Sequence, residues 1–233
     1  MLWYRIIIIA YFLRNGGIIL KLNERGLLVI ISGPSGVGKG TIRKALFEIP
    51  DNNFCYSVSM TTRKPRIGEV DGIDYFFVTR EEFEKRIKAN GFLEYAEFVG
   101  EYYGTPIDYI EKMMEKGKEV IVEIEVEGAL QVREKNPEAV FIFIVPPSRQ
   151  ALIERLKNRG TDSPETIMKR IEKAEREFHL AYKYDYIVVN DEIINAADRI
   201  YAIIRAEHAK TERSIHRYYK LLEGKEWLKI NTI

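Results

Sequence analysis

Cysteine is almost absent from this sequence. Cys55 is the only one among 233 residues, which excludes an intrachain disulfide and makes a reducing, cytoplasmic setting the expected one. An excess of charge of one sign is missing as well, because 36 Lys and Arg residues stand against 35 Asp and Glu residues. A balance this even argues against a general affinity for nucleic acid or for an anionic membrane surface, so any basic patch must be local.

Long apolar runs are also lacking. The longest run near the N-terminus covers residues 6–13 and stops at Arg14, whereas a membrane-spanning helix needs about 20 apolar residues. Residues 1–24 show no small-residue cleavage pattern, so we expect an extension outside the folded domain rather than a signal or an anchor. Internal repeats, low-complexity tracts and Pro/Gly linkers are missing, which predicts one continuous domain without independent parts.

The sequence does contain an alternation of short apolar runs and helical patterns. Four continuous apolar runs are typical of strands buried on both faces of a parallel sheet: 27–32, 119–125, 139–145 and 185–190. The stretch from about 54 to 104 differs, because its apolar runs are shorter, aromatic and partly alternating. These runs, beginning with FCYSVSM, predict a small sheet inserted into the parallel core.

Several helices have recognisable ends. Thr79 and Glu82 fit a capping box, and Gly91 is expected to end that helix. Thr105–Pro106 and Ser163–Pro164 each place a hydroxyl before a proline at the predicted first helical position. A last, long helix is predicted over about residues 192–222.

The motif GPSGVGKGT, residues 33–41, is the most informative in the chain. It follows a predicted strand and precedes the helical pattern IRKALFEI, the context that a phosphate-binding loop requires. Glycines let several N–H groups point at one anion, and the following helix adds its positive end. Lys39 is expected to supply a mobile charge for the β- and γ-phosphates of a nucleotide. The expected loop consists of Gly33, Pro34, Ser35, Gly36, Val37, Gly38, Lys39, Gly40 and Thr41.

The loop departs from the general pattern G-x-x-x-x-G-K-[ST] at one position. Gly40 follows the lysine, and the hydroxyl comes one residue later, on Thr41. A Mg²⁺ ion is therefore expected to rest on ATP oxygens and water, with no direct protein ligand and with carboxylates behind it. Thr41, Glu123 and Glu125 are the residues that could act through water.

Glu123 and Glu125 lie at the carboxyl end of a predicted strand, where open α/β sheets bind ligands. Their spacing of two residues puts them on one face of that strand. Three interpretations stay open: a water-mediated role at Mg²⁺, contacts to the ribose of a second substrate, or a solvated strand end.

Seven segments, in their order and spacing, closely resemble the bacterial guanylate kinase family. They are ISGPSGVGKGT, SVSMTTRKPRIGEVDGIDYFFV, FLEYAEFVGEYYGTP, EIEVEGALQV, VPPS, RLKNRGTDS and YIVVND. The resemblance covers about residues 27–210, and GKGT is one of the loop variants that the family uses. It implies an α/β fold: a P-loop nucleoside monophosphate kinase core with a parallel sheet flanked by helices, a small mixed-β GMP-binding insertion and a helical lid.

The resemblance also implies an activity and a division of the chain. The activity is transfer of the γ-phosphoryl of MgATP to GMP, with dGMP as a further acceptor, giving ADP and GDP. The oligomeric state stays open, a homo-oligomer included. The implied division is an extension over 1–24 and a domain over 25–233, with its core at about 25–54, 111–149 and 181–222, its insertion at about 55–110 and its lid at about 150–180.

Guanine recognition is assigned to three residues by the resemblance. Guanine presents donors at N1 and N2 and an acceptor at O6, so its selection needs a carboxylate and a hydroxyl or amide. The family places its guanine-reading glutamate at Glu94, with Ser59 and Thr105 as hydroxyl partners. By alternation, Glu94 shares a strand face with the apolar Phe92, Ala96 and Phe98; without the resemblance it would equally fit an exposed edge position.

The resemblance assigns the GMP phosphate to two arginines and two tyrosines. Arg63 and Arg66 offer planar guanidinium groups that suit phosphate oxygens, and Tyr75 and Tyr103 match the family's phosphate-contacting tyrosines. Glu69 is expected to orient one of the arginines. Without the resemblance, the tyrosines would fit core packing and the arginines would fit solvated loop charges.

The lid is expected to supply positive charge around the transferred group. Arg155 and Arg159 are four residues apart on one predicted helical face, and Arg170 follows on the next helix. Asn190, at the end of a core strand, resembles the family's adenine-side asparagine. No general base is proposed, because the GMP phosphate is already an anionic nucleophile and positioning should suffice.

Two alternatives belong to other classes. A non-catalytic guanylate-kinase-like binding module would be expected to lose the glycine loop and its lysine, and this chain keeps both. A P-loop kinase for another phosphorylated acceptor would have no use for a guanine-reading set of Ser59, Glu94 and Thr105.

Overall fold

The computed structural model describes residues 25–158 and 163–215. The expected N-terminal extension, Arg159 and the end of the last predicted helix lie outside the described residues. No helix within the described ranges is long and apolar enough to cross a membrane.

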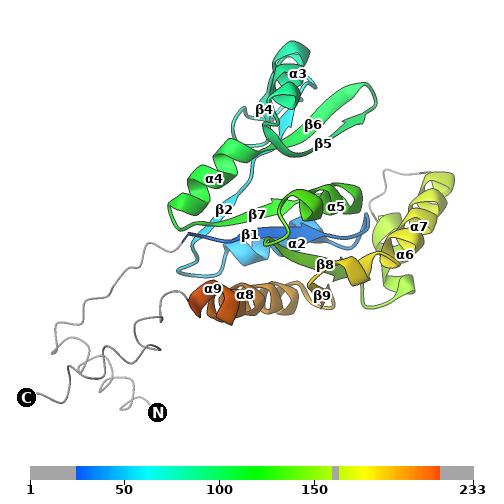
Figure 1. The fold of residues 1–233 in the computed structure, drawn as a ribbon. Helices are drawn as coiled ribbons and strands as arrows, with labels where there is room; N and C mark the ends of the chain where they lie inside the picture. The colour runs from blue at the N-terminus through cyan, green and yellow to red at the C-terminus, as the bar shows by residue number, and fades with distance from the viewer. Residues whose placement is uncertain (1–24, 159–162, 216–233) are drawn as a thin grey trace, which may run out of the picture.

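A five-stranded parallel sheet forms the centre of the fold, in the order β2-β7-β1-β8-β9 (Figure 1). The four strands predicted from apolar runs are confirmed, each within one or two residues of its predicted ends. Burial on both faces is wrong for the last of them, β9, which is an edge strand with Ile187 and Val189 exposed. The sheet consists of β1 (Leu28–Ser32), β2 (Phe54–Tyr56), β7 (Glu119–Glu123), β8 (Val140–Val145) and β9 (Tyr186–Val189).

β2 corrects the expectation that FCYSVSM belongs wholly to the inserted sheet. Phe54, Cys55 and Tyr56 pair in parallel with β7 at the edge of the central sheet. Their side chains are half-buried, as is usual for an edge strand. An edge strand of the central sheet and a strand of an inserted sheet share an aromatic, partly alternating pattern, so the sequence does not distinguish them.

Helices cover both faces of the central sheet. Val29 and Ile31 of β1 pack into one core, to which α2, α6, α7 and α8 contribute. Leu28 and Ile30 face the opposite way and pack with α4 and α5. The helices are α2 (Lys39–Phe47), α4 (Ile107–Glu115), α5 (Val126–Lys135), α6 (Arg149–Asn158), α7 (Pro164–Phe178) and α8 (Ile193–Ala209).

A second, smaller sheet projects from the core, in the order β4-β3-β6-β5. It is mixed, because β3 pairs in parallel with β4 and antiparallel with β6. Its separate core contains Met60, Phe83 and Phe92. The elements are β3 (Met60–Thr61), β4 (Phe76–Phe77), α3 (Arg80–Lys88), β5 (Phe92–Phe98) and β6 (Glu101–Pro106). This arrangement confirms the predicted fold class.

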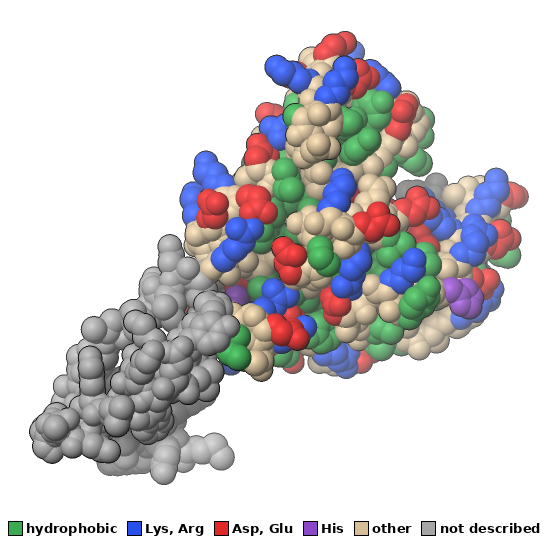
Figure 2. All heavy atoms as spheres, in the orientation of Figure 1, with side chains coloured by type: hydrophobic (Ala, Val, Ile, Leu, Met, Phe, Trp, Pro, Cys, Tyr) green, Lys and Arg blue, Asp and Glu red, His purple; other side chains and the backbone are tan. Residues whose placement is uncertain are grey.

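Two parts project from the central sheet. In Figure 1 the small sheet stands above it, and the α6–α7 pair lies at the right of the view. The surface is hollowed between them, and positive and negative side chains are mixed over the visible face (Figure 2). The expected bounds of the insertion and the lid remain predictions.

Two of the three predicted helix starts are confirmed. Thr79 and Glu82 form the capping box, and Ser163 caps α7 ahead of Pro164. The Thr105–Pro106 start is wrong, because Thr105 belongs to β6 and Pro106 is itself the cap, with extended backbone (φ −65°, ψ 127°). The end of α3 also differs, since Asn90 takes the left-handed conformation (φ 52°) expected at Gly91.

The last predicted helix is interrupted at Lys210, so one continuous helix is wrong within the described residues. Lys210 is extended (φ −60°, ψ 131°) between α8 and the short α9 (Thr211–Ser214). The turn lets Arg213 reach back to the buried Glu207, with Nε 3.0 Å from Oε2. This ion pair, formed across the break, is a tertiary effect that helical propensity does not predict.

Candidate active site

Residues 33–41 form a tight loop between β1 and α2. Gly38 precedes α2 with φ 91°, and a Cβ atom there would lie 2.4 Å from Asn190 Nδ2. Both the left-handed backbone and the close approach require glycine at this position. Lys39 begins α2, so the free N–H groups and the positive end of that helix face the loop.

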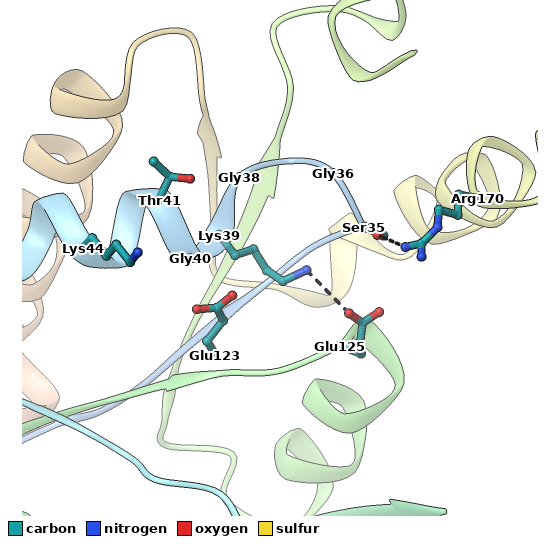
Figure 3. A pocket seen from close by; sticks show the side chains of 10 residues that line it. All are labelled: Ser35, Gly36, Gly38, Lys39, Gly40, Thr41, Lys44, Glu123, Glu125 and Arg170. Carbon is teal, nitrogen blue, oxygen red and sulfur yellow. Dashed lines mark hydrogen bonds and ion pairs between the residues drawn. The ribbon is translucent and has the colours of Figure 1, made fainter. Parts of the chain in front are cut away.

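The Lys39 side chain folds back over its own loop. Its Nζ donates to the carbonyl oxygens of Gly33 at 2.6 Å and of Pro34 at 3.3 Å. Glu125 Oε1 lies 3.8 Å from the same nitrogen, as Figure 3 shows. Two carbonyl oxygens and a carboxylate thus hold the lysine over the loop. A bound phosphate could replace them as the partner of its ammonium group.

A hollow of about 550 Å³ opens beside the loop. It is lined by loop residues, by Glu123 and Glu125, and by Arg170 from α7, whose Nη1 donates to Ser35 Oγ at 2.7 Å (Figure 3). An arginine of the expected lid therefore already touches the expected phosphate-binding loop. Amide groups, a lysine and an arginine around one hollow are chemistry suited to a polyphosphate.

Glu123 and Glu125 separate in the structure, which corrects the expectation that they share one strand face. β7 ends at Glu123, and Glu125 is the extended N-cap residue of α5, so the chain turns between them. Glu123 Oε2 accepts a hydrogen bond from Arg43 Nε at 3.1 Å. Glu125 instead lies between two lysines, Lys39 and Lys173, whose Nζ atoms are 3.8 and 3.7 Å from its carboxylate oxygens.

A second hollow, of about 250 Å³, lies on the other side of the loop between α6 and the end of β9. Arg155 donates to the carbonyl oxygens of Val37 at 3.2 Å and Asn190 at 2.8 Å. Asn190 is 3% exposed, and its Nδ2 donates to Val37 O at 2.7 Å. Exposed Ile193 adds an apolar wall. A polar amide beside an apolar wall suits an aromatic base.

Glu94 is the buried acid of the small sheet, 9% exposed, and Thr105 Oγ1 donates to its Oε1 at 2.7 Å. Burial raises the pKa of the Glu94 carboxyl, and the Thr105 hydrogen bond and the charge of Lys135 offset part of that effect. A Cβ atom at Gly128 would lie 3.1 Å from Glu94 Oε2. The acid therefore sits between the small sheet and α5.

The predicted strand face of Glu94 is wrong. The pairing of β5 with β6 shifts register between Phe92 and Tyr95, so these two residues, three apart, approach the same point at Gly104. Glu94 consequently points away from Phe92 and bonds the residue after Gly104, Thr105. Such a bulge re-aims a side chain, and strict alternation cannot predict it.

Arg63 is held in a fixed orientation by Glu69. Its Nη1 and Nη2 donate to Glu69 Oε2 at 2.9 Å and Oε1 at 2.8 Å. The Arg63 hydrogen bond, and then the Arg66 backbone N–H, lower the pKa of the Glu69 carboxyl. The Arg63 guanidinium also lies 5.5 Å from the ring centre of Tyr75, which in turn contacts Tyr103 at 6.1 Å between ring centres. The structure thus brings Arg63, Glu69, Tyr75 and Tyr103 into one cluster.

Three further predicted residues lie near these groups: the Arg66 backbone N–H donates to Glu69 Oε2 at 2.7 Å, Thr41 lines both hollows, and Ser59 lies next to β3. Ser59 is half-buried in the segment before β3, and its carbonyl oxygen accepts from Phe76 N at 2.8 Å. The Arg66 side chain is exposed. Thr41 is exposed on α2 and lies on a different side of the helix from Glu123 (Figure 3).

Five residues around the loop were not predicted from the sequence, and one of them is Lys44 of α2, which lines the larger hollow. Arg43 follows Lys39 by four positions, a spacing that puts both on one face of α2 and that could have been noticed. Tyr56 stacks under Arg43, with 4.1 Å from guanidinium to ring centre. Lys173 and Ile193 reach the site through the packing of α7 and α8, for which the sequence carries no signal.

The fold and the site together define a class: a P-loop phosphotransferase whose small sheet adds a second polar site next to the nucleotide loop. A family model described as Guanylate kinase matches residues 25–207. The chain belongs to the guanylate kinase family.

Individual relatives agree with the family model. A guanylate kinase of Onion yellows phytoplasma (strain OY-M) is 64% identical over 205 residues, which cover 88% of this chain and 97% of the relative. One of Streptococcus mutans is 57% identical over 201 residues, or 86% and 96% of the two chains. The crystal structure of guanylate kinase from Anaplasma phagocytophilum superimposes with a TM-score of 0.64 at 37% identity, covering 82% of this chain and 90% of that chain.

Proposed function

We propose that this chain transfers the γ-phosphoryl group of MgATP to GMP, giving ADP and GDP. The observation that carries the choice of acceptor is the buried Glu94 carboxylate held by Thr105. A buried carboxylate with one oxygen occupied by a hydroxyl has its other oxygen left for ligand donors, and guanine offers two adjacent donors at N1 and N2. Adenine would present its own acceptor at the N1 position, so Glu94 disfavours it.

The donor nucleotide is assigned to the loop and its two neighbouring hollows. Lys39 exchanges its carbonyl partners for the β- and γ-phosphates, while backbone N–H groups of the loop bind the remaining oxygens. The adenine lies against Asn190 and Ile193 in the second hollow. Arg155 holds Val37 and Asn190 together, and thus supports both the phosphate and the base positions.

The acceptor phosphate is assigned to Arg63, Arg66, Tyr75 and Tyr103. Glu69 fixes the orientation of the Arg63 guanidinium by accepting hydrogen bonds from Nη1 and Nη2. Ser59 joins Glu94 and Thr105 at the base, and Glu125 faces the ribose side. Because these contacts involve the base and the 5′-phosphate, dGMP is proposed as a second acceptor.

The metal is proposed to arrive as MgATP. Mg²⁺ in nucleotide sites keeps several waters and binds phosphate oxygens, so it needs few ligands from the protein. Glu123 faces the loop at Gly40 and would hold those waters. When bound, Mg²⁺ supplies neutralising charge at the β- and γ-phosphate oxygens.

The chain's own contribution to the chemistry is positioning and positive charge. Phosphoryl transfer spreads negative charge over the moving group. Arg155, Arg159 and Arg170 of the proposed lid, together with Lys39, neutralise that charge, and closure of the lid excludes water that would otherwise hydrolyse ATP. The acceptor needs no base, because its phosphate is already ionised at neutral pH. The single cysteine fits a reducing cytoplasm as the setting.

A coupled assay of ADP release tests this proposal. The purified chain is given MgATP and, in separate reactions, GMP, dGMP, IMP, AMP, CMP or UMP. GMP and dGMP should stimulate ADP release by orders of magnitude over ATP alone, and AMP and the pyrimidines should not. Equal stimulation by AMP would remove the assignment of Glu94, and no stimulation by any acceptor would refute the activity.

A further inference from the structure

The glycine that follows Lys39 is unexplained by the phosphate-binding loop alone. Most such loops place a hydroxyl at this position, and here the side chain is missing. A Cβ atom built at Gly40 would lie 3.6 Å from Glu123 Oε1 and 3.7 Å from Oε2, which is ordinary contact distance. The Glu123 carboxylate therefore occupies the space into which a hydroxyl at residue 40 would point (Figure 3).

The position of that carboxylate depends on Arg43. Glu123 is the last residue of β7, with its side chain 20% exposed, and Arg43 Nε donates to its Oε2 at 3.1 Å. A hydrogen bond between two charged groups restricts the rotation of the acid. Arg43 is in turn restricted, because its guanidinium lies 4.1 Å from the centre of the Tyr56 ring.

Arginine is the residue that this arrangement requires. A guanidinium can donate from Nε to the carboxylate and at the same time lie flat on the Tyr56 ring. A lysine keeps the charge but cannot do both. Three elements meet here, since Arg43 comes from α2, Glu123 from β7 and Tyr56 from β2.

We infer that Arg43 is a positioning residue that fixes Glu123 opposite Gly40, so that the carboxylate holds the water ligands of nucleotide-bound Mg²⁺ in place of the loop's missing hydroxyl. This inference rests on the proposed function for its nucleotide. It assigns Glu123 to the metal side of the site rather than to the ribose, and it explains why the loop works with glycine at position 40.

Calorimetry of ADP binding to the full chain, with excess MgCl₂ and with EDTA, tests the inference without requiring turnover. Arg43→Lys should weaken ADP binding about tenfold in MgCl₂, the scale of one hydrogen bond to a charged group, and should leave binding in EDTA within about twofold. Glu123→Gln should have the same effect as Arg43→Lys, because it removes the charge that Arg43 orients.

A matched control is offered by Arg80. Its Nε also bonds a carboxylate, Glu84 Oε1 at 3.1 Å, and its guanidinium also lies over a tyrosine, 4.4 Å from the Tyr102 ring centre. Arg80 is on the outer helix of the small sheet, so Arg80→Lys should leave ADP binding unchanged in both solutions.

Gly40→Ser provides a rescue that a purely structural role of Arg43 would not show. The space at Gly40 accepts a Cβ atom without a clash, and serine would restore the hydroxyl that most such loops place there. When it is added to Arg43→Lys, Gly40→Ser should raise the affinity for ADP in MgCl₂ at least about threefold over that of Arg43→Lys alone. The inference would be overturned if Arg43→Lys kept the wild-type Mg²⁺ dependence of ADP binding. It would also be overturned if Arg43→Lys lost as much affinity for ADP in EDTA as in MgCl₂.

The outcome also separates this inference from the proposed function. If wild-type protein binds MgADP but no acceptor stimulates ADP release, the proposed acceptor is wrong while the Arg43 comparison still holds. If acceptor-stimulated turnover is normal and Arg43→Lys keeps the wild-type Mg²⁺ dependence of ADP binding, the inference alone is wrong.

Discussion

Replacing Glu94 by glutamine changes one atom of the proposed guanine site and keeps its shape. In the structure the Glu94 carboxylate is buried, and one of its oxygens is already bonded by Thr105 at 2.7 Å. Glutamine can still accept that bond, but its amide group then turns a donor toward the N1 and N2 donors of guanine. The substitution therefore tests base recognition with little change in packing.

The expected loss follows from the groups involved. One hydrogen bond to a charged acceptor contributes about 1.5–3 kcal/mol, which corresponds to a Kd for GMP raised about 10- to 150-fold. Calorimetry with GMP measures this directly. IMP, which lacks the 2-amino group, should bind the wild-type protein more weakly than GMP, and Glu94→Gln should remove most of that difference. An unchanged Kd for GMP would refute the assignment.

Glu94→Gln should weaken GMP binding but stabilise the folded protein, because burial raises the pKa of the Glu94 carboxyl. A carboxyl whose pKa is higher in the folded than in the unfolded state favours folding when protonated, so its contribution to stability falls as pH rises from about 4.5 through the raised value. At pH 7 Glu94→Gln should thus melt at a higher temperature than the wild-type protein, and the two should converge below about pH 4.5. A lower melting temperature at pH 7 would contradict a desolvated acid.

Four further substitutions test other parts of the site. Lys39→Ala should cut turnover at least about 100-fold with an unchanged melting curve, since its Nζ contacts loop carbonyls and Glu125 rather than the core; near-normal turnover would refute its role. Glu69→Gln should release Arg63 and raise the KM for GMP about fivefold, while an equal change in the KM for ATP would argue for general misfolding. Gly38→Ala should abolish ATP binding and destabilise the fold by about 1–3 kcal/mol, whereas Gly40→Ala should fold normally; equal effects would contradict the loop geometry.

Much of the fold could be predicted because it rests on local patterns. The continuous apolar runs of β1, β7 and β8 indicate strands buried on both faces, and the structure buries them in that way. β9 differs, because it is the edge strand of the sheet and its Ile187 and Val189 are exposed. The capping box at Thr79 and the Ser163–Pro164 start are equally local, since each satisfies free N–H groups within one helical turn.

The errors arose where long-range contacts override local preference. β2 joins the central sheet because β7 offers it an edge, which no pattern in FCYSVSM records. Thr105 has the local sequence of a helix cap, yet its hydroxyl bonds Glu94, eleven residues earlier in the chain. Lys210 interrupts a helix so that Arg213 can pair with Glu207.

The site shows the same division. The loop residues and Lys39 were predictable from spacing alone, because a strand, a glycine loop and a helix form a continuous segment. The acceptor residues were assigned only through the family resemblance. Arg43, Tyr56 and Lys173 escaped notice because each acts through a partner on another element, namely Glu123 for Arg43 and Glu125 for Lys173.

The proposed reaction is tested most directly by following the γ-phosphoryl group from ATP to its acceptor. The chain is incubated with ATP labelled in its γ-phosphate and with unlabelled GMP, and the labelled species are separated by chromatography. Label should leave ATP and appear in the β-phosphate of GDP, in a one-to-one ratio with ADP. Label found only in inorganic phosphate, at a rate that GMP does not change, would contradict the proposal that two opposed nucleotide sites exchange a phosphoryl group.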